Sequence, residues 1–170
     1  MAAAADPAVC PGCGARLPPT DGPVHAYMLS SPACWAAYGE VLAREYQSPD
    51  LMLVHRLSVD AWAVQHPGDG SRRAIQSVGL HLARLMIQLE EGLHGSDAHD
   101  RMLAFAARKA EIQPLEPPAR WSNTVADFVD ACAPPAHIAA VQAWAAAVWG
   151  DMAVHHALIR RWATGGPWRS

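Results

Sequence analysis

The chain has 170 residues, of which 51% are hydrophobic and only 17% are charged. This balance excludes an intrinsically disordered chain, which needs few apolar residues and a high net charge. The length predicts a single domain over residues 1–170 and is too short for two ordinary domains. The formal net charge of −3 and the dispersed arginines argue against a surface for nucleic acid or for an anionic membrane.

The first six residues lack the positive and apolar regions of a signal peptide, and no apolar run approaches the roughly 18 residues that cross a bilayer. We therefore expect a soluble, cytoplasmic protein, whose thiols stay reduced. Four cysteines in that setting indicate a metal or core packing rather than disulfides.

Residues 1–31 are expected to be an irregular, loop-like segment, because proline and glycine are frequent and apolar periodicity is weak. A helical part over residues 32–170 follows it. Its expected helices cover about 32–47 (capped by Ser31), 49–66, 72–93 (capped by Ser71), 96–113, a short helix after Thr124, and 135–163.

The last expected helix carries an apolar stripe at alternating three- and four-residue steps, which is typical of a helix packed in a bundle. The stripe consists of Val141, Trp144, Val148, Met152, His155, Ile159 and Trp162, and a C-cap is expected at Gly165–Gly166. Strand patterns are absent from the sequence. The predicted fold is all-α, a helical bundle of about five helices preceded by an irregular N-terminal metal-binding loop.

Cys10 and Cys13 form a Cys-x-x-Cys pair whose prolines and glycines allow a tight turn. Cys34 adds a third thiolate from the first turn of the first helix, where the helix dipole favours a negative charge. His25 lies between them and completes a Cys3His set, the donor set of a tetrahedral zinc site. The sequence therefore predicts zinc as the cofactor, bound by Cys10, Cys13, His25 and Cys34.

The fourth ligand has alternatives, namely a helix histidine or a water molecule, and a water would make the site open and catalytic. A thioredoxin-like redox pair is a rival interpretation, but that motif requires a βαβ context, which the sequence lacks. Cys132 is expected to be a small buried hydrophobic residue.

Several histidines fall inside the expected helices. His55 and His66 share a helix face but are about 16 Å apart along the axis, too far for one metal. If the second and third expected helices form an antiparallel hairpin, His55 and His81 lie at nearly the same distance from its turn. His155 lies on the apolar stripe of the last helix. These three histidines are a candidate second metal or acid–base site, in which Asp60 orients one of the rings or contributes its own carboxylate. Hydrogen-bonded core histidines are the alternative.

Segments 10–14, 21–35, 54–68 and 144–149 resemble a bacterial family known as domain of unknown function 5946, over nearly the whole chain. The most distinctive stretch is Val59-Asp60-Ala-Trp62-Ala-Val-Gln-His66-Pro. Trp62 departs from the family, which has tyrosine there. Some relatives have no histidine at the place of His25, so the resemblance raises His66 or His55 as substitute ligands. It supports the architecture and the metal site and implies no reaction.

Two functional hypotheses remain. In the first, zinc attaches the N-terminal loop to the bundle, and the bundle has a binding or regulatory role. In the second, the protein is a metal-dependent enzyme of the hydrolase type, using an open zinc position or the His55, His81 and His155 site. Nucleic acid and membranes are not expected as partners, whereas a protein partner, a small-molecule ligand and a homodimer stay open.

Overall fold

The computed structural model describes residues 6–164, in which the chain forms six α-helices and one two-stranded antiparallel sheet. In chain order the elements are β1 (Ala8–Val9), β2 (Arg16–Leu17), α1 (Pro32–Tyr46), α2 (Met52–Gln65), α3 (Arg72–Leu89), α4 (Gly95–Ala106), η1 (Lys109–Glu111), η2 (Val125–Asp127), α5 (Pro134–Asp151), η3 (Ala153–His155) and α6 (His156–Thr164). The predicted all-α class is confirmed. No helix in this part of the chain is long and apolar enough to cross a membrane.

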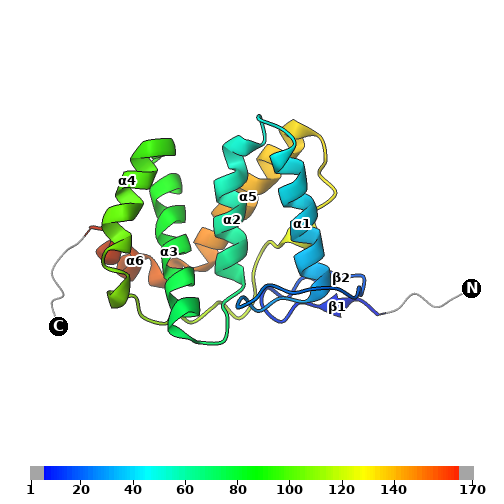
Figure 1. The fold of residues 1–170 in the computed structure, drawn as a ribbon, viewed down its shortest axis with the longest axis horizontal. Helices are drawn as coiled ribbons and strands as arrows, with labels where there is room; N and C mark the ends of the chain where they lie inside the picture. The colour runs from blue at the N-terminus through cyan, green and yellow to red at the C-terminus, as the bar shows by residue number, and fades with distance from the viewer. Residues whose placement is uncertain (1–5, 165–170) are drawn as a thin grey trace, which may run out of the picture.

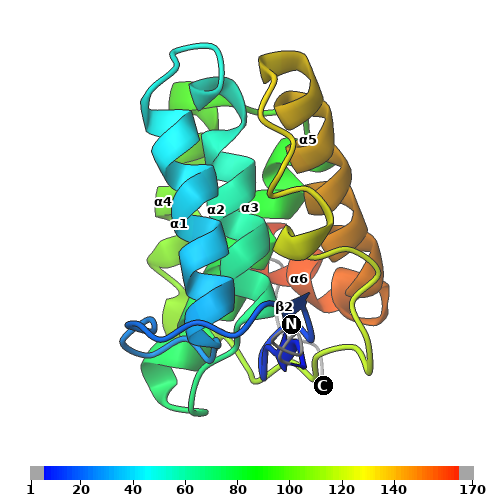
Figure 2. The ribbon, with the colours of Figure 1, turned by 90° about the vertical axis from the view of Figure 1, so that its right-hand side faces the viewer.

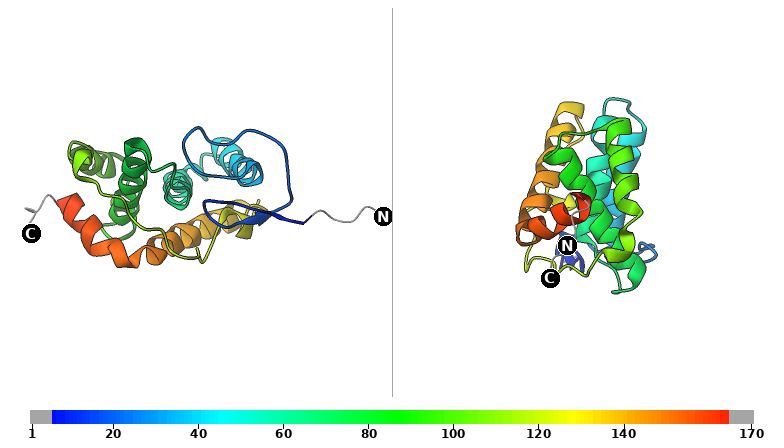
Figure 3. Two further views of the ribbon diagram at one scale, coloured as in Figure 1. Left: turned by 90° about the horizontal axis from the view of Figure 1, so that it is seen from below. Right: turned by 90° about the vertical axis from the view of Figure 1, so that its left-hand side faces the viewer.

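The helices form two layers. Helices α1 to α4 stand side by side in one layer. Helices α5 and α6 form the second layer and cross one face of the first, as the views from below and from the side show (Figures 1, 2 and 3). Helix α2 is central and packs mainly against α3 and α5. Its residues 60–66 are all buried, which is typical of a helix surrounded by neighbours. The N-terminal hairpin lies across the end of this layer, beneath α1 and α2 (Figure 1).

Three of the expected helix starts depend on local capping and are confirmed. The hydroxyl of Ser31 accepts a hydrogen bond from the backbone N–H of Cys34 at 3.1 Å, and that of Ser71 does the same for Ala74 at 3.3 Å. Thr124 precedes η2, and its backbone N–H bonds to the Asp127 carboxylate at 2.7 Å. In each case a side chain satisfies an N–H group that the first turn leaves without a partner.

Two other helix starts differ from the prediction, and α3 and α4 end earlier than expected, at Leu89 and Ala106. Helix α2 begins at Met52 rather than at Pro49, because Ser48 forms a turn in which its carbonyl accepts from the N–H groups of Leu51 and Met52. Helix α4 begins one residue before Ser96 and has no side-chain cap. The expected C-cap at Gly165–Gly166 lies outside the described residues.

The last expected helix is divided into α5 and α6, which corrects the prediction of one continuous helix. The division occurs where the carbonyl of Trp149 accepts hydrogen bonds from the N–H of Met152 at 3.1 Å and from Nε2 of His156 at 2.8 Å. The His156 ring also stacks on Trp149, at 3.7 Å between centroids. The His156 side chain thus donates to a backbone carbonyl that, in a straight helix, would accept from a backbone N–H of the same helix. The apolar stripe nevertheless continues across the break, since Val148, Met152 and Ile159 are all buried.

A buried carboxylate joins α1, α2 and α5. Glu45 is fully buried, and its Oε2 accepts hydrogen bonds from Nδ1 of His55 and from the hydroxyl of Ser58, both at 2.8 Å. Its Oε1 accepts from Nε2 of His137 at 3.1 Å. Arg44 donates to Nδ1 of His137 at 3.2 Å, which leaves the proton of that ring on Nε2. Both oxygens of the buried acid are thus satisfied, as burial requires.

Replacing Glu45 by alanine should destabilise the fold by about 3–5 kcal/mol, because it leaves donors of two other helices, α2 and α5, without their acceptor. Urea unfolding followed by circular dichroism measures this change. The matched control is Glu40→Ala on the exposed side of the same helix, for which we expect a change within about 0.5 kcal/mol. Equal effects of the two substitutions would contradict a structural role for the Glu45 network.

Candidate metal centre

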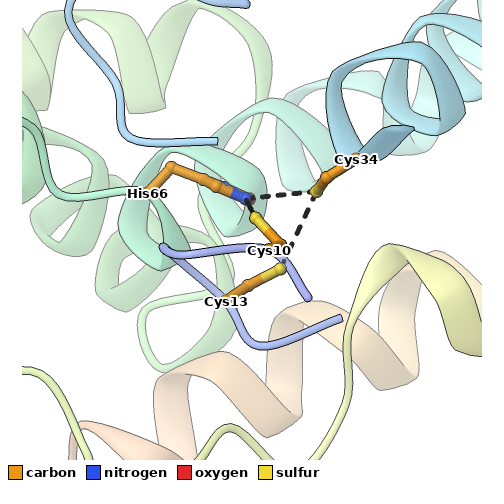
Figure 4. A group of neighbouring side chains, drawn as sticks. All are labelled: Cys10, Cys13, Cys34 and His66. Atoms are coloured by element: carbon orange, nitrogen blue, oxygen red, sulfur yellow. Dashed lines mark hydrogen bonds between the residues drawn. The ribbon is translucent and has the colours of Figure 1, made fainter. Parts of the chain in front are cut away.

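Three cysteines and one histidine meet where the N-terminal hairpin contacts α1 and α2. The ligand atoms of Cys10, Cys13, Cys34 and His66 all lie within 4.8 Å of one another, and all four residues are buried. Their side chains point toward one common centre from three separate segments (Figure 4). Within residues 6–164 this is the one group of three or more His, Cys, Asp or Glu arranged in this way.

The hairpin presents two of the thiols. Strands β1 and β2 pair antiparallel, and the backbone N–H of Cys10 continues the ladder by bonding to the carbonyl of Ala15 at 2.8 Å. The turn closes when the N–H of Gly14 bonds to the carbonyl of Cys10 at 2.9 Å, with Gly14 at φ 76°. That left-handed conformation favours glycine, so the turn requires a glycine directly after the second cysteine. Both sulfurs consequently face the same side.

The third thiol, that of Cys34, comes from the first turn of α1. Ser31 caps this turn by accepting from the Cys34 N–H, and Pro32 at the start of the helix fixes the backbone there. Cys34 itself is 0% exposed. Its Sγ lies 3.8 Å from that of Cys13. The positive end of the α1 dipole favours a thiolate at this position.

The imidazole of His66 is oriented by the helix that it ends. Nδ1 lies 2.6 Å from the carbonyl of Trp62, one turn earlier, and the ring stacks on the indole of Trp62 at 4.0 Å between centroids. Because a carbonyl only accepts, the proton sits on Nδ1, and Nε2 faces the sulfurs with its lone pair. Nε2 lies 3.3 Å from Sγ of Cys34 and 3.5 Å from Sγ of Cys10. This tautomer is the one that binds a metal through Nε2.

These separations match the edges of a metal tetrahedron. With Zn–S bonds of about 2.3 Å and Zn–N bonds of about 2.05 Å, tetrahedral angles place two sulfurs roughly 3.8 Å apart and a sulfur and a nitrogen roughly 3.6 Å apart. The Cys13–Cys34 distance of 3.8 Å and the two His66 distances of 3.3 and 3.5 Å agree with these values to within a few tenths of an ångström. The other three pairs of ligand atoms lie within 4.8 Å of each other, so the group could hold one metal ion.

The three thiols also strongly perturb each other's acidity. Hydrogen bonds with Cys13 and Cys34 hold the pKa of Cys10 far below its ordinary value, whereas hydrogen bonds with Cys10 and Cys13 raise the pKa of Cys34 far above it. Hydrogen bonding with Cys10 and burial raise the pKa of Cys13 to about 12. One thiolate is thus favoured at the expense of the other two. Ionising all three in a buried cluster requires a cation to offset their mutual repulsion.

His25, predicted as the fourth ligand, is not in this group, and His66 takes the place. Nδ1 of His25 accepts hydrogen bonds from the backbone N–H groups of Tyr27 and Met28, at 3.4 and 3.2 Å, and so closes a local turn. Burial lowers the pKa of His25, with a further contribution from the charge of Arg73. Spacing favoured His25 because it is near the cysteines in sequence, whereas His66 reaches them only through the packing of α2 on the hairpin.

The other candidate histidines are not brought together. His55 bonds to Glu45, His81 bonds through Nδ1 to Asp60 at 2.7 Å, and Nε2 of His155 donates to the carbonyl of Glu116 at 2.8 Å. Each therefore has its own partner, and the second site suggested for His55, His81 and His155 does not form. The suggestion that Asp60 orients a histidine ring agrees with its contact to His81. His55 also does not serve as a fourth ligand of the cysteine group.

Comparison with known proteins identifies one family. A model described as "Family of unknown function (DUF5946)" matches residues 8–153, a span that contains all four residues of the group. The curated proteins and the solved structures gave no match.

Gly12 should be essential for the geometry of this centre. A Cβ at this position would collide with the carbonyl oxygen of Leu29 and approach Cδ2 of His66 to 2.8 Å. We therefore expect Gly12→Ala to weaken metal affinity, measured by competition with a chromogenic chelator, and to lower the melting temperature. Gly39→Ala on α1 is the control, because a Cβ there meets nothing within 4 Å. Unchanged affinity in Gly12→Ala would contradict the close packing described here.

Proposed function

Because the chain belongs to the DUF5946 family, a family of unknown function, we propose its role from the geometry of the site: Cys10, Cys13, Cys34 and His66 bind one structural zinc ion. The ion attaches the N-terminal hairpin to α1 and α2, and the helical bundle has a binding or regulatory role. The observation that carries the proposal is the burial of all four donors, whose exposed fractions lie between 0% and 4%.

Zinc suits this donor set for two reasons. Three thiolates and one imidazole in a tetrahedral arrangement are typical of structural zinc sites, whereas harder ions such as Mg²⁺ and Ca²⁺ select oxygen ligands. Three thiolates and a divalent ion also leave a net charge of only −1, which buried surroundings tolerate better than three free thiolates.

A structural rather than a catalytic ion is favoured by the count of donors. A catalytic zinc site keeps one position for water and substrate, and a structural site fills all four with protein atoms. Here four protein atoms already surround one centre, and the orienting bond from His66 to Trp62 supplies the outer support that fixed metal sites show.

The metal should contribute to stability because its ligands come from three segments that it joins. Cys10 and His66 are 56 residues apart, so the ion closes a long loop that is open in the unfolded chain. The hairpin itself contributes little apolar surface besides Ala15 and Leu17 to the core, and its attachment therefore depends on the thiolates.

Metal analysis tests the proposal. Wild-type protein purified without chelator should contain about one zinc ion per chain by inductively coupled plasma mass spectrometry, and Cys13→Ser and His66→Ala should contain much less. His66→Cys should retain zinc, since a fourth thiolate can replace the imidazole. His25→Ala is the control and should keep the metal. Wild-type protein without any metal, or loss of metal in His25→Ala but not in His66→Ala, would overturn the assignment.

Chelation should unfold the attachment and expose the thiols. Removal of zinc should lower the free energy of unfolding by at least about 4 kcal/mol, the value for free metal a thousandfold above its dissociation constant. A thiol reagent should modify one cysteine rapidly before chelation and four afterwards. The rapid one is Cys132, which is exposed in the segment before α5, so the prediction that it is buried is wrong. Four rapidly reacting thiols in the metal-loaded protein would contradict a site in which the three cysteines bind the ion.

A further inference from the structure

A cavity of about 730 Å³ lies at the end of the bundle remote from the metal centre. It is bounded by the beginnings of α2, α4 and α5 and by the end of α3, in the upper part of Figure 1. Its volume is in the range of sites that hold a small organic molecule. One side is open to solvent, where Leu53 and His99 are exposed.

The ionisable side chains that line this cavity are all basic. Arg56 from α2 and Arg84 from α3 face it together with His94 and His99 from the start of α4, and no Asp or Glu is among the described residues that line it. The formal net charge of the whole chain is −3, so the lining of the cavity is more basic than the protein as a whole. The cavity therefore favours an anion.

The two arginine side chains differ from other arginines of the bundle in their direct contacts. Within residues 6–164 neither guanidinium makes an ion pair or a hydrogen bond, unlike Arg44, Arg72 and Arg101, each of which donates to carbonyl oxygens. Arg84 is half-buried, and burial lowers its pKa, as does the nearby charge of Arg56. Two guanidinium groups that repel each other beside a cavity gain energy when an anion binds between them.

The one nearby acid is already engaged. Asp60 raises the pKa of Arg84, but its Oδ1 accepts from His81 at 2.7 Å and its Oδ2 accepts from Nε2 of Gln88 at 2.9 Å. Asp60 is fully buried and lies outside the lining, whereas Gln88 is part of it. The five N–H donors of Arg84 thus remain available to a ligand.

The rest of the lining is apolar. Met52, Leu57 and Ile138 supply hydrocarbon walls, and Leu53 at the opening is 79% exposed. Gly95 at the start of α4 also lines the cavity, and no side chain caps this helix, while Asp97 of its first turn lies outside the lining. A charged end and an apolar body are therefore both accommodated.

We propose that this cavity binds a small amphiphilic anion, a carboxylate or phosphate monoester on an apolar chain, with Arg56 and Arg84 as the anion-binding residues. The proposal gives a ligand class to the binding role proposed above for the bundle and rests on that role. It does not depend on the metal, because none of the residues that line the cavity is a member of the Cys3His group.

The experiment titrates the zinc-loaded protein with octyl phosphate and octanoate, following amide chemical shifts by NMR and affinity by calorimetry. Inorganic phosphate tests the anion without the apolar chain, and octylammonium tests the chain without the anion. We expect the octyl anions to shift residues of the cavity and to bind at least about tenfold more tightly than either of the other two probes.

Variants then assign the charge. Arg56→Gln combined with Arg84→Gln should weaken octyl phosphate binding at least about tenfold, while the control Arg120→Gln, which removes one positive charge from an exposed loop outside the lining, should not change it. Zinc content and melting temperature of each variant show that the fold and the metal centre are intact. Equal binding of octylammonium, equal weakening by Arg120→Gln, or no shift at the cavity in zinc-loaded protein would overturn the inference, and the metal proposal would still stand.

Discussion

The hydrogen bond between Nδ1 of His66 and the carbonyl of Trp62 determines which way the imidazole faces. The contact of α2 with the cysteines of the hairpin and of α1 depends on this orientation. With its proton on Nδ1, the ring turns Nε2 toward the sulfurs of Cys10 and Cys34. Pro67 cannot continue the helix, so α2 ends where its histidine meets the hairpin. A different end for α2 would leave three buried thiols without their fourth partner.

The interior of the bundle contains two carboxylates that serve different ends. Glu45 is surrounded by donors from α2 and α5 and ties these helices to α1. Asp60 is satisfied by His81 and Gln88 of α3 alone, and the neighbouring Arg84 is left without a hydrogen-bonding partner among the described residues. Glu45 thus stabilises the packing of three helices. Asp60 makes its hydrogen bonds to other side chains, so Arg84 faces the cavity without a hydrogen bond to it. The candidate metal centre and the cavity lie at opposite ends of α2, which connects them through a buried and well-packed segment.

The accuracy of the sequence-based predictions follows the range of the interactions involved. Ser31, Ser71 and Thr124 are correctly predicted as helix starts, because each capping bond joins a backbone N–H and a side chain only three residues apart. The division between α5 and α6 was missed, since the apolar stripe is unbroken in sequence and the cause is a side chain, that of His156, which captures a backbone carbonyl. The tight turn of the Cys10–Cys13 pair was predictable from Gly14, whereas the pairing of β1 with β2, only two residues each, was too short to leave a pattern.

By itself the sequence determined the helical class, the cysteine turn and the three cysteines of the candidate centre, because these depend on periodicity and on residues close along the chain. Only the tertiary structure decided the fourth member of that centre. Cys10 and His66 are 56 residues apart, and nothing local distinguishes His66 from the other histidines of the bundle. Their meeting requires the hairpin to fold beneath the end of α2, a contact set by the packing of the whole chain. The same holds for the cavity, whose two arginines lie on different helices and converge only after α2 and α3 pack together.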